Sequence, residues 1–284
     1  MDEGSVDRRA HVDVDGFPRG PRIGRTRAGV VLAGATLLLG IGAPWIAPYD
    51  PHLIVGPSLE APSATHWMGT DALGRDLWSG VVWGARTSWM VGLATALLTA
   101  LLGAPVGIAA GLGGGRTDDL LMRGTEFFQT LPRFFLAILV IALFGAGADR
   151  IVLVLALTSW TGTARVVRSE VLSLREHDFV RAARASGASG MQIAAGEILP
   201  NVLPLVTVLF GLAVGRVMLV EASLSFLGLG DPSLLSWGAL AGQGQAFLRS
   251  AWWLATFPGA AIAVSVLGLN LVGDGLNRRL ESST

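Results

Sequence analysis

Long apolar runs constrain this sequence more than any other feature. A helix needs about 20 mostly apolar residues to cross the hydrocarbon core of a bilayer. The chain has 284 residues, of which 51% are hydrophobic and 15% charged, and its mean hydropathy is +0.56. These properties predict an all-α polytopic membrane protein with six transmembrane helices. The predicted spans are 28–46, 88–112, a third that begins near Thr125, 151–167, 200–220 and 254–272.

The spans divide the chain into segments. Residues 1–27 mix aspartate, arginine and proline without apolar periodicity, which predicts a disordered tail. A secretory signal peptide is the competing interpretation of the first apolar run, but no A-x-A site closes that run, so a retained first helix at 28–46 is favoured. An external loop at 47–87, a five-helix core at 88–273 and a tail at 274–284 complete the predicted organisation.

The distribution of arginine predicts the orientation. With six spans and both termini inside, fifteen arginines lie on the inner side and four on the outer side. This is the bias that the positive-inside rule expects, so both termini and the loop 177–201 are predicted to be cytoplasmic. The remaining two, Arg133 and Arg216, fall in helices. Arg216 either extends to the outer headgroups or faces inward, where it could contact a substrate.

Residue types that are absent exclude several kinds of chemistry. The sequence contains neither lysine nor cysteine, so this chain has no P-loop lysine, lysine Schiff base, disulfide or thiolate metal site. An intramembrane enzyme is disfavoured because all four histidines lie outside the spans and no H-E-x-x-H string occurs. A secondary transporter is also disfavoured, since the spans show little charge at mid-depth and no clear internal repeat.

Small and polar residues suggest how the helices pack. Gly103, Gly107 and Gly111 recur every four residues, a spacing that lets another helix approach closely in lipid. The residues 113–123 read as a turn, and Pro132 as a kink within the third helix. The hydroxyls in the fourth span either line a wet path or bond within the helix bundle; these are Thr158, Ser159, Thr161 and Thr163.

The polar interval 177–201 predicts a helix, a turn and a second helix between two spans. Asp178 can cap the first helix, and Phe179, Ala182, Ala183 and Ser186 share one face at helical spacing. Gly187 suits a left-handed residue after that helix. Ser189 can cap the second helix, and Pro200 marks entry into the next span. Such a shallow, small-residue helix can dock into a groove on a soluble protein.

These residues resemble the EAA coupling loop of the permease subunits of bacterial ABC importers. The resemblance rests on Ala182, Ala183, Gly187, Leu199 and Pro200. Arg181 stands where that family has glutamate, and Glu197 stands at an apolar position, with Ile198 one place later. The resemblance implies that the loop docks on a separate ATPase. Arg181 either pairs with an acidic residue of that partner or faces solvent.

The segment HWMGTDALGRD carries a second signal. Physical reasoning predicts a short surface helix, in which Thr70 is the cap and Asp71 pairs with Arg75 four residues later. The string also resembles the G-T-D-x-x-G-R-D signature of the dipeptide, oligopeptide and nickel permease branch, found in its external loop. The residues that carry this resemblance are Gly69, Thr70, Asp71, Gly74, Arg75 and Asp76.

Two later strings, at 221–230 and 257–276, resemble the closing segments of the second permease subunit of the same branch. The resemblance implies a type I importer permease in the bacterial inner membrane, which forms half of a translocation pathway for peptides. It implies a second permease, two ATP-binding subunits and an extracytoplasmic binding protein as partners, with no nucleic acid. ATP and Mg²⁺ would bind to the partners, and this chain itself would carry no catalytic residue, metal or cofactor. Nickel is the alternative cargo.

Overall fold

The computed structural model describes residues 22–281, and within that range the chain is helical with no strand. One isolated bridge pairs Thr70 with Asp76. The α-helices are α1 (Arg22–Ile41), α2 (Ala43–Ile46), α3 (Leu77–Gly113), α4 (Gly115–Thr130), α5 (Arg133–Phe144), α6 (Ala148–Leu174), α7 (Asp178–Ala185), α8 (Gly190–Ile193), α9 (Leu199–Phe226), α10 (Trp237–Gly244) and α11 (Trp253–Glu281). A π-helical turn η1 (Ala194–Ile198) joins α8 to α9, and a 3₁₀ turn η2 (Gln245–Phe247) follows α10.

Four helical segments of the described chain are long and apolar enough to cross a membrane: Leu77–Gly113, Ala148–Leu174, Gly190–Phe226 and Trp253–Arg278. A fifth candidate is the pair α4 and α5, which meet at an angle of 73°. The predicted third span is therefore wrong as a single kinked helix. Leu131 and Pro132 are both extended, and proline cannot continue the hydrogen-bond ladder, so the chain breaks there.

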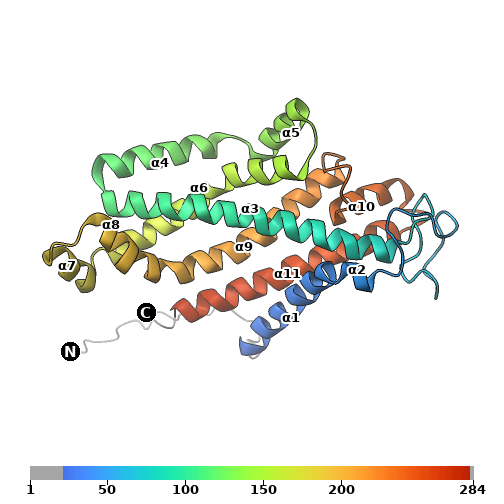
Figure 1. Cartoon of the computed structure of the whole chain (residues 1–284), viewed down its shortest axis with the longest axis horizontal. Helices are drawn as coiled ribbons and strands as arrows, with labels where there is room; N and C mark the ends of the chain where they lie inside the picture. The colour runs from blue at the N-terminus through green and yellow to red at the C-terminus, as the bar shows by residue number, and fades with distance from the viewer. Residues whose placement is uncertain (1–21, 282–284) are drawn as a thin grey trace, which may run out of the picture.

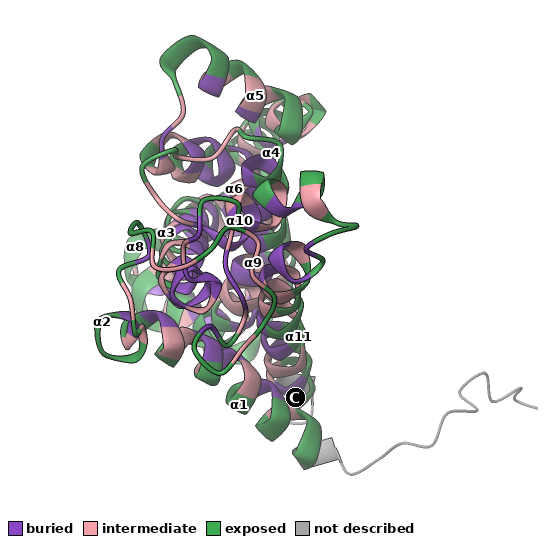
Figure 2. Ribbon diagram, turned by 90° about the vertical axis from the view of Figure 1, so that its right-hand side faces the viewer, coloured by how far each residue is buried: buried purple, intermediate pink, exposed green. Residues whose placement is uncertain are grey.

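The helices form an elongated bundle with two distinct ends (Figure 1). One end carries α7 and α8, and we call it the α7 end. The opposite end carries α10 and the loop 47–76, and we call it the α10 end. Buried residues concentrate where α3, α6 and α9 meet, whereas α5 and the outward sides of α1 are largely exposed (Figure 2).

The predicted glycine stripe lies at the largest helix contact of the bundle, between α3 and α6. A Cβ atom at Gly107 would lie 2.5 Å from the carbonyl oxygen of Ala164. At Gly103 and Gly111 it would meet Thr163 and Val171 at 2.7 Å or less. The stripe therefore allows close backbone approach, as the sequence predicted.

A second small-residue contact joins α1 to α11. A Cβ atom at Gly29 would lie 2.7 Å from the Cβ atom of Leu271. One at Gly268 would lie 2.6 Å from the backbone nitrogen of Ala33. Helix α1 thus lies along α11, although α1 itself does not reach the length and hydropathy of the four candidate spans.

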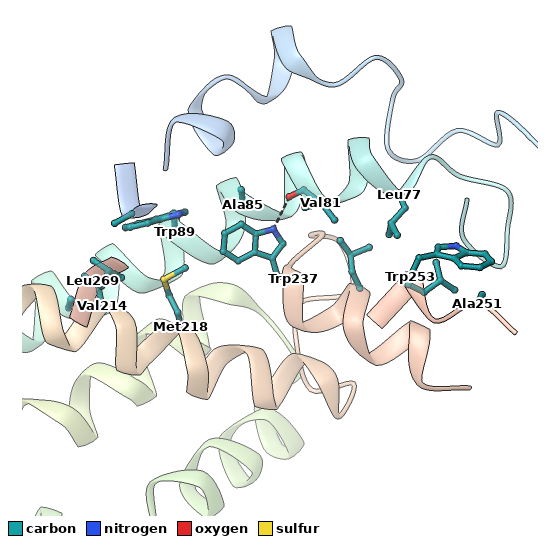
Figure 3. Close-up of a cluster of buried hydrophobic side chains, with 14 residues drawn as sticks. Leu77, Val81, Ala85, Trp89, Val214, Met218, Trp237, Ala251, Trp253 and Leu269 are labelled. Atoms are coloured by element: carbon teal, nitrogen blue, oxygen red, sulfur yellow. Dashed lines mark hydrogen bonds between the residues drawn. The ribbon is translucent and has the colours of Figure 1, made fainter. Parts of the chain in front are cut away.

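The largest buried side chain, that of Trp237, holds the α10 end together (Figure 3). Its indole nitrogen donates a hydrogen bond of 2.8 Å to the carbonyl oxygen of Val81 in α3. Met218 of α9 and Trp253 of α11 belong to the same cluster of buried side chains. This cluster fixes α10 against three long helices.

Several predicted boundaries are wrong by more than a turn. Helix α3 begins at Leu77, because Asp76 caps it, so the last part of the predicted loop 47–87 is helical. The predicted turn 113–123 is mostly the first half of α4. At the termini, residues 22–27 and 274–281 belong to helices rather than tails, while the predicted tail residues 1–21 and 282–284 lie outside the described range.

Candidate functional site

The candidate coupling loop projects from the α7 end of the bundle (Figure 1). Helix α7 forms over the predicted residues, but His177 rather than Asp178 is its N-cap, and no side chain caps it there. Asp178 is the first helical residue, where its negative charge is favourable at the positive end of the helix. The predicted helix is confirmed, and the predicted cap is wrong by one residue.

A single apolar anchor seats α7 on the bundle. Val180 is fully buried and belongs to a cluster with Val171 and Leu174 of α6 and Ile108 of α3. Ala183 packs against the same cluster. Val180 was not among the predicted residues of this loop, although its spacing of three residues from Ala183 is the signal that identifies this inner face.

The rest of the predicted apolar face points away from the bundle. Phe179 is 38% exposed, and Ala182 and Ser186 are exposed as well. Leu199 is 42% exposed at the start of α9, and Pro200 beside it is exposed too. Small and apolar groups are thus presented outward at this end, as a docking surface requires.

Gly187 ends α7 in the conformation that the sequence predicted. Its φ of +85° lies in the left-handed region that favours glycine. The backbone nitrogens of Gly187 and Ala188 donate to the carbonyl oxygens of Arg184 and Ala183, both at 3.1 Å. This pattern is a Schellman motif, which satisfies the last carbonyl groups of the helix and fixes the direction of the chain.

Ser189 caps α8, as predicted. Its hydroxyl accepts a hydrogen bond from the backbone nitrogen of Gln192, and the Gln192 side chain accepts one from the backbone nitrogen of Ser189. This reciprocal capping box closes the start of the second helix. Hydrogen bonds therefore fix both the C-terminal end of α7 and the start of α8, which restrains the turn between the two helices.

In the loop pattern the apolar residue is expected at position 197, but in this chain it is Ile198. The π-helical turn η1 explains this displacement by one position. A π-helix bonds residue i to residue i+5 and so accommodates one more residue than an α-helical turn. Within η1, Ile198 is fully buried, whereas Glu197 is only half-buried beside an open pocket. The buried apolar contact is thus made by Ile198, one residue after the position that the loop pattern predicts.

Arg181 extends from α7 into solvent. Its side chain is 63% exposed, and its nearest charged neighbours are Glu176 at 3.5 Å and Asp178 at 3.9 Å. Contacts of this length between exposed groups contribute little to stability. Arg184, on the same helix, is also exposed. The outward surface of α7 therefore carries positive charge that a partner could meet.

The external signature forms a tight loop at the α10 end instead of the predicted helix. Thr70 is fully buried, and its hydroxyl donates to the carbonyl oxygen of Pro57 at 2.5 Å and accepts from the backbone nitrogen of Glu60 at 2.9 Å. The indole nitrogen of Trp253 donates to the carbonyl oxygen of Thr70 at 3.3 Å. Thr70 therefore joins three separate segments.

Asp71 closes a turn and forms no ion pair with Arg75. Its carboxylate accepts hydrogen bonds from the backbone nitrogens of Leu73 at 2.8 Å and Arg75 at 2.9 Å. Gly74, within this turn, has a φ of +77° and lies so close to Gly56 that a Cβ atom would meet its carbonyl oxygen at 2.2 Å. The prediction of an Asp71 to Arg75 pair four residues apart is wrong, because the side chain satisfies the turn's own backbone.

Asp76 connects this loop to the bundle. One carboxylate oxygen accepts from the backbone nitrogen and the hydroxyl of Ser79 and caps α3. The other lies 2.9 Å from Nδ1 of His66, a buried residue that was not among the predicted site residues. The signature residues therefore shape the loop and fix it to α3 and α11.

Comparison with known proteins identifies the family of the chain. The family model described as "Binding-protein-dependent transport system inner membrane component" matches residues 103–284. A putative peptide transport system permease protein of Brucella suis biovar 1 (strain 1330) is 41% identical over 257 residues, which cover 90% of this chain and 86% of that protein. The nickel transport system permease protein NikC of Escherichia coli (strain K12) is 37% identical, with coverage of 90% and 93%.

The fold also matches a solved transporter. A chain of the MetNI methionine ABC transporter, determined in inward-facing conformations, superposes with a TM-score of 0.60 at 18% sequence identity. The match covers 73% of this chain and 97% of that chain. With this fold, its membrane-spanning helices and a relative at 41% identity, the protein is a multi-pass membrane protein that belongs to the family of inner-membrane components of binding-protein-dependent transport systems.

Proposed function

We propose that this chain is a permease subunit of an ATP-driven ABC importer for peptides and forms half of its translocation pathway. The observation that carries the proposal is the α7–α8 loop, which is anchored by buried Val180 and presents Phe179 and Ala182 outward. The 41% identity to a peptide permease supports peptides as the cargo. The nickel permease among the relatives makes a nickel complex the second candidate.

The proposed topology has six transmembrane helices and both termini in the cytoplasm. Helix α1 is the additional span: its first turns carry Arg25 and Arg27, and an apolar stretch follows from Ala28. Arginines at the start of a span favour a cytoplasmic start. In this orientation the α7 end faces the cytoplasm and the α10 end, with the signature loop 69–76, faces outward.

One of two cytoplasmic ATPase subunits would receive α7 in a surface groove. ATP binding closes such a pair, and rigid segments pass the displacement to the spans. The anchoring cluster provides this rigidity, because Val180 and Ile198 pack on residues of α3, α6 and α9. A second, homologous permease would supply the other half of the pathway, and an extracytoplasmic protein would deliver substrate at the α10 end. ATP and Mg²⁺ would bind to the ATPases.

Copurification tests the proposal. The chain carries an affinity tag, is solubilised from its native membrane in mild detergent and is analysed by mass spectrometry. We expect a second permease and one or two P-loop ATPases to accompany it. Recovery of the chain alone, in a detergent shown to preserve a related importer complex, would contradict the proposal and favour an ion-driven secondary transporter.

A further inference from the structure

Two arginines lie within the membrane-spanning part of the chain. Arg133 is the first residue of α5, immediately after the break in the bent α4–α5 pair, and Arg216 lies within α9. Both are exposed on the surface of the chain. Their neighbours in sequence are apolar: Phe134 and Phe135 follow the first, and Val217 and Met218 follow the second.

The two arginines lie beside one cluster of buried side chains. Ala137, one turn after Arg133, and Val217, next to Arg216, are buried in the same cluster. The two guanidinium groups are close enough to interact electrostatically. Like charges repel, and the repulsion is stronger where water is scarce. The chain therefore places one exposed positive charge on α5 and a second on α9, beside the same buried cluster.

Three arginines of α6 and its C-terminal cap, by contrast, have partners within the chain. Arg168 forms a two-pronged ion pair with Asp118, Arg165 donates to the side chain of Gln129, and Arg175 donates to the carbonyl oxygen of Gly111. Among residues 22–281, Arg133 and Arg216 have no such hydrogen bond or ion pair with another residue. Their donors are available to a group outside this chain.

Contact with lipid does not explain this surface. An arginine near the centre of a lipid-facing helix is energetically costly, and two that repel each other cost more. Helices broken near the middle of the membrane are common at the substrate sites of transporters, and the break at Leu131 and Pro132 adjoins Arg133. The pair is better placed on a water-filled path than against acyl chains.

We propose that Arg133 and Arg216 line the translocation path and bind the C-terminal carboxylate of a peptide during its passage. The proposal rests on the proposed importer function and specifies its substrate class. Guanidinium groups bind carboxylates through charge-assisted hydrogen bonds, often two at once. The same pair repels a bare divalent cation, so it favours a carboxylate-bearing cargo over free Ni²⁺.

Cysteine accessibility tests this proposal without knowledge of the natural cargo. The sequence has no cysteine, so Leu219→Cys introduces a unique thiol. Leu219 is 47% exposed and lies one turn from Arg216. The assembled transporter, in proteoliposomes, is treated with an anionic or a cationic methanethiosulfonate reagent.

The ratio of the two labelling rates is compared in Leu219→Cys alone and in Leu219→Cys combined with Arg133→Gln and Arg216→Gln. Leu219→Cys with Arg249→Gln is the matched control, because Arg249 is exposed in the segment between α10 and α11.

We expect both reagents to reach the thiol. The arginine pair should raise the anionic-to-cationic rate ratio about tenfold over the double Gln variant, and Arg249→Gln should leave the ratio unchanged. Trialanine should slow the anionic reaction more than its C-terminal amide does. Absence of labelling, a ratio that does not depend on the two arginines, or equal protection by trialanine and its amide would overturn the proposal.

Assembly is measured first, so the two proposals fail separately. If no ATPase copurifies with the chain, the importer function itself is contradicted. If the complex assembles and hydrolyses ATP but the thiol shows none of the expected behaviour, only the role of Arg133 and Arg216 is contradicted.

Discussion

One carboxylate oxygen of Asp76 lies 2.9 Å from Nδ1 of His66, and the other carboxylate oxygen caps helix α3 through Ser79. A single buried side chain thus joins the loop at the α10 end to the helix with the most extensive packing in the bundle. The GRD part of the signature therefore holds the loop in place through the side chain of its aspartate.

Replacing Asp76 with alanine removes both contacts. We expect Asp76→Ala to lower the free energy of unfolding by at least the usual value of a helix cap, about 0.5–2 kcal/mol, because His66 also loses its partner. Thermal unfolding in detergent measures the effect. Asp50→Ala is the control, since its carboxylate accepts only an exposed hydrogen bond from the backbone of His52. Equal midpoints for the two variants would contradict the assignment.

Gly107 tests the contact between α3 and α6. A Cβ atom there would lie 2.5 Å from the carbonyl oxygen of Ala164, so Gly107→Ala should separate the helices and destabilise the fold by about 1–3 kcal/mol. Gly162→Ala in α6 is the matched control, because no neighbouring atom lies within 4 Å of its added Cβ. Alanine favours helix over glycine by about 1 kcal/mol, so the control should unfold at a higher temperature. Unfolding temperatures that shift in the same direction in Gly107→Ala and Gly162→Ala would contradict this prediction.

The sequence predicted the elements that depend on local rules. The apolar runs identified the long helices, the four-residue glycine spacing identified the α3–α6 contact, and Ser189 and Gly187 marked the ends of α8 and α7. Each depends on residues that are close together in the sequence, so each is visible without tertiary structure.

The errors arise where distant segments decide the structure. Thr70 is a loop residue because Pro57, Glu60 and Trp253 supply its partners from elsewhere in the chain. The buried role of Val180 depends on the ends of α3 and α6, which sequence periodicity in an eight-residue helix does not reveal. At Pro132 the helix is interrupted and not merely kinked, because Leu131 is extended as well.

Asp231 gives a prediction for pH dependence. The Ser233 hydroxyl donates to its carboxylate, and with the backbone nitrogens of Ser233 and Ala148 it holds the pKa of Asp231 below its usual value. A lowered pKa means that the ionised form stabilises the fold above the unfolded-state pKa, about 3.9. This stabilisation is lost as the pH falls through the lower, folded-state pKa.

The measurement compares the wild type with Asp231→Asn. At pH 7 the variant should unfold at a lower temperature, because α6 loses a charged acceptor at its first backbone nitrogen. The difference should persist down to about pH 4 and shrink in more acidic buffer. If the difference in unfolding temperature grew as the pH was lowered, the ionised Asp231 carboxylate would not be the stabilising form.

Gly187 tests whether the shape of the coupling loop matters for transport. Its φ of +85° is strained for leucine, whereas asparagine adopts the left-handed region more readily. We expect Gly187→Leu to remain in the membrane but to lose most ATP-driven uptake, and Gly187→Asn to retain most of it. Uptake in proteoliposomes and ATP hydrolysis are measured on the same preparation. Full uptake by the leucine variant would argue against a coupling role.

The proposed function requires that the outward surface of α7 contacts an ATPase subunit. Because the chain has no cysteine, Ala182→Cys places one thiol on that surface, and a bifunctional thiol- and photo-reactive reagent records what lies against it. The same reagent on Leu53→Cys, exposed at the α10 end, is the control. We predict a cross-link from residue 182 to a P-loop ATPase and none from residue 53. A complex that retains its ATPase activity but gives no ATPase cross-link from residue 182 would show that α7 does not dock on the ATPase.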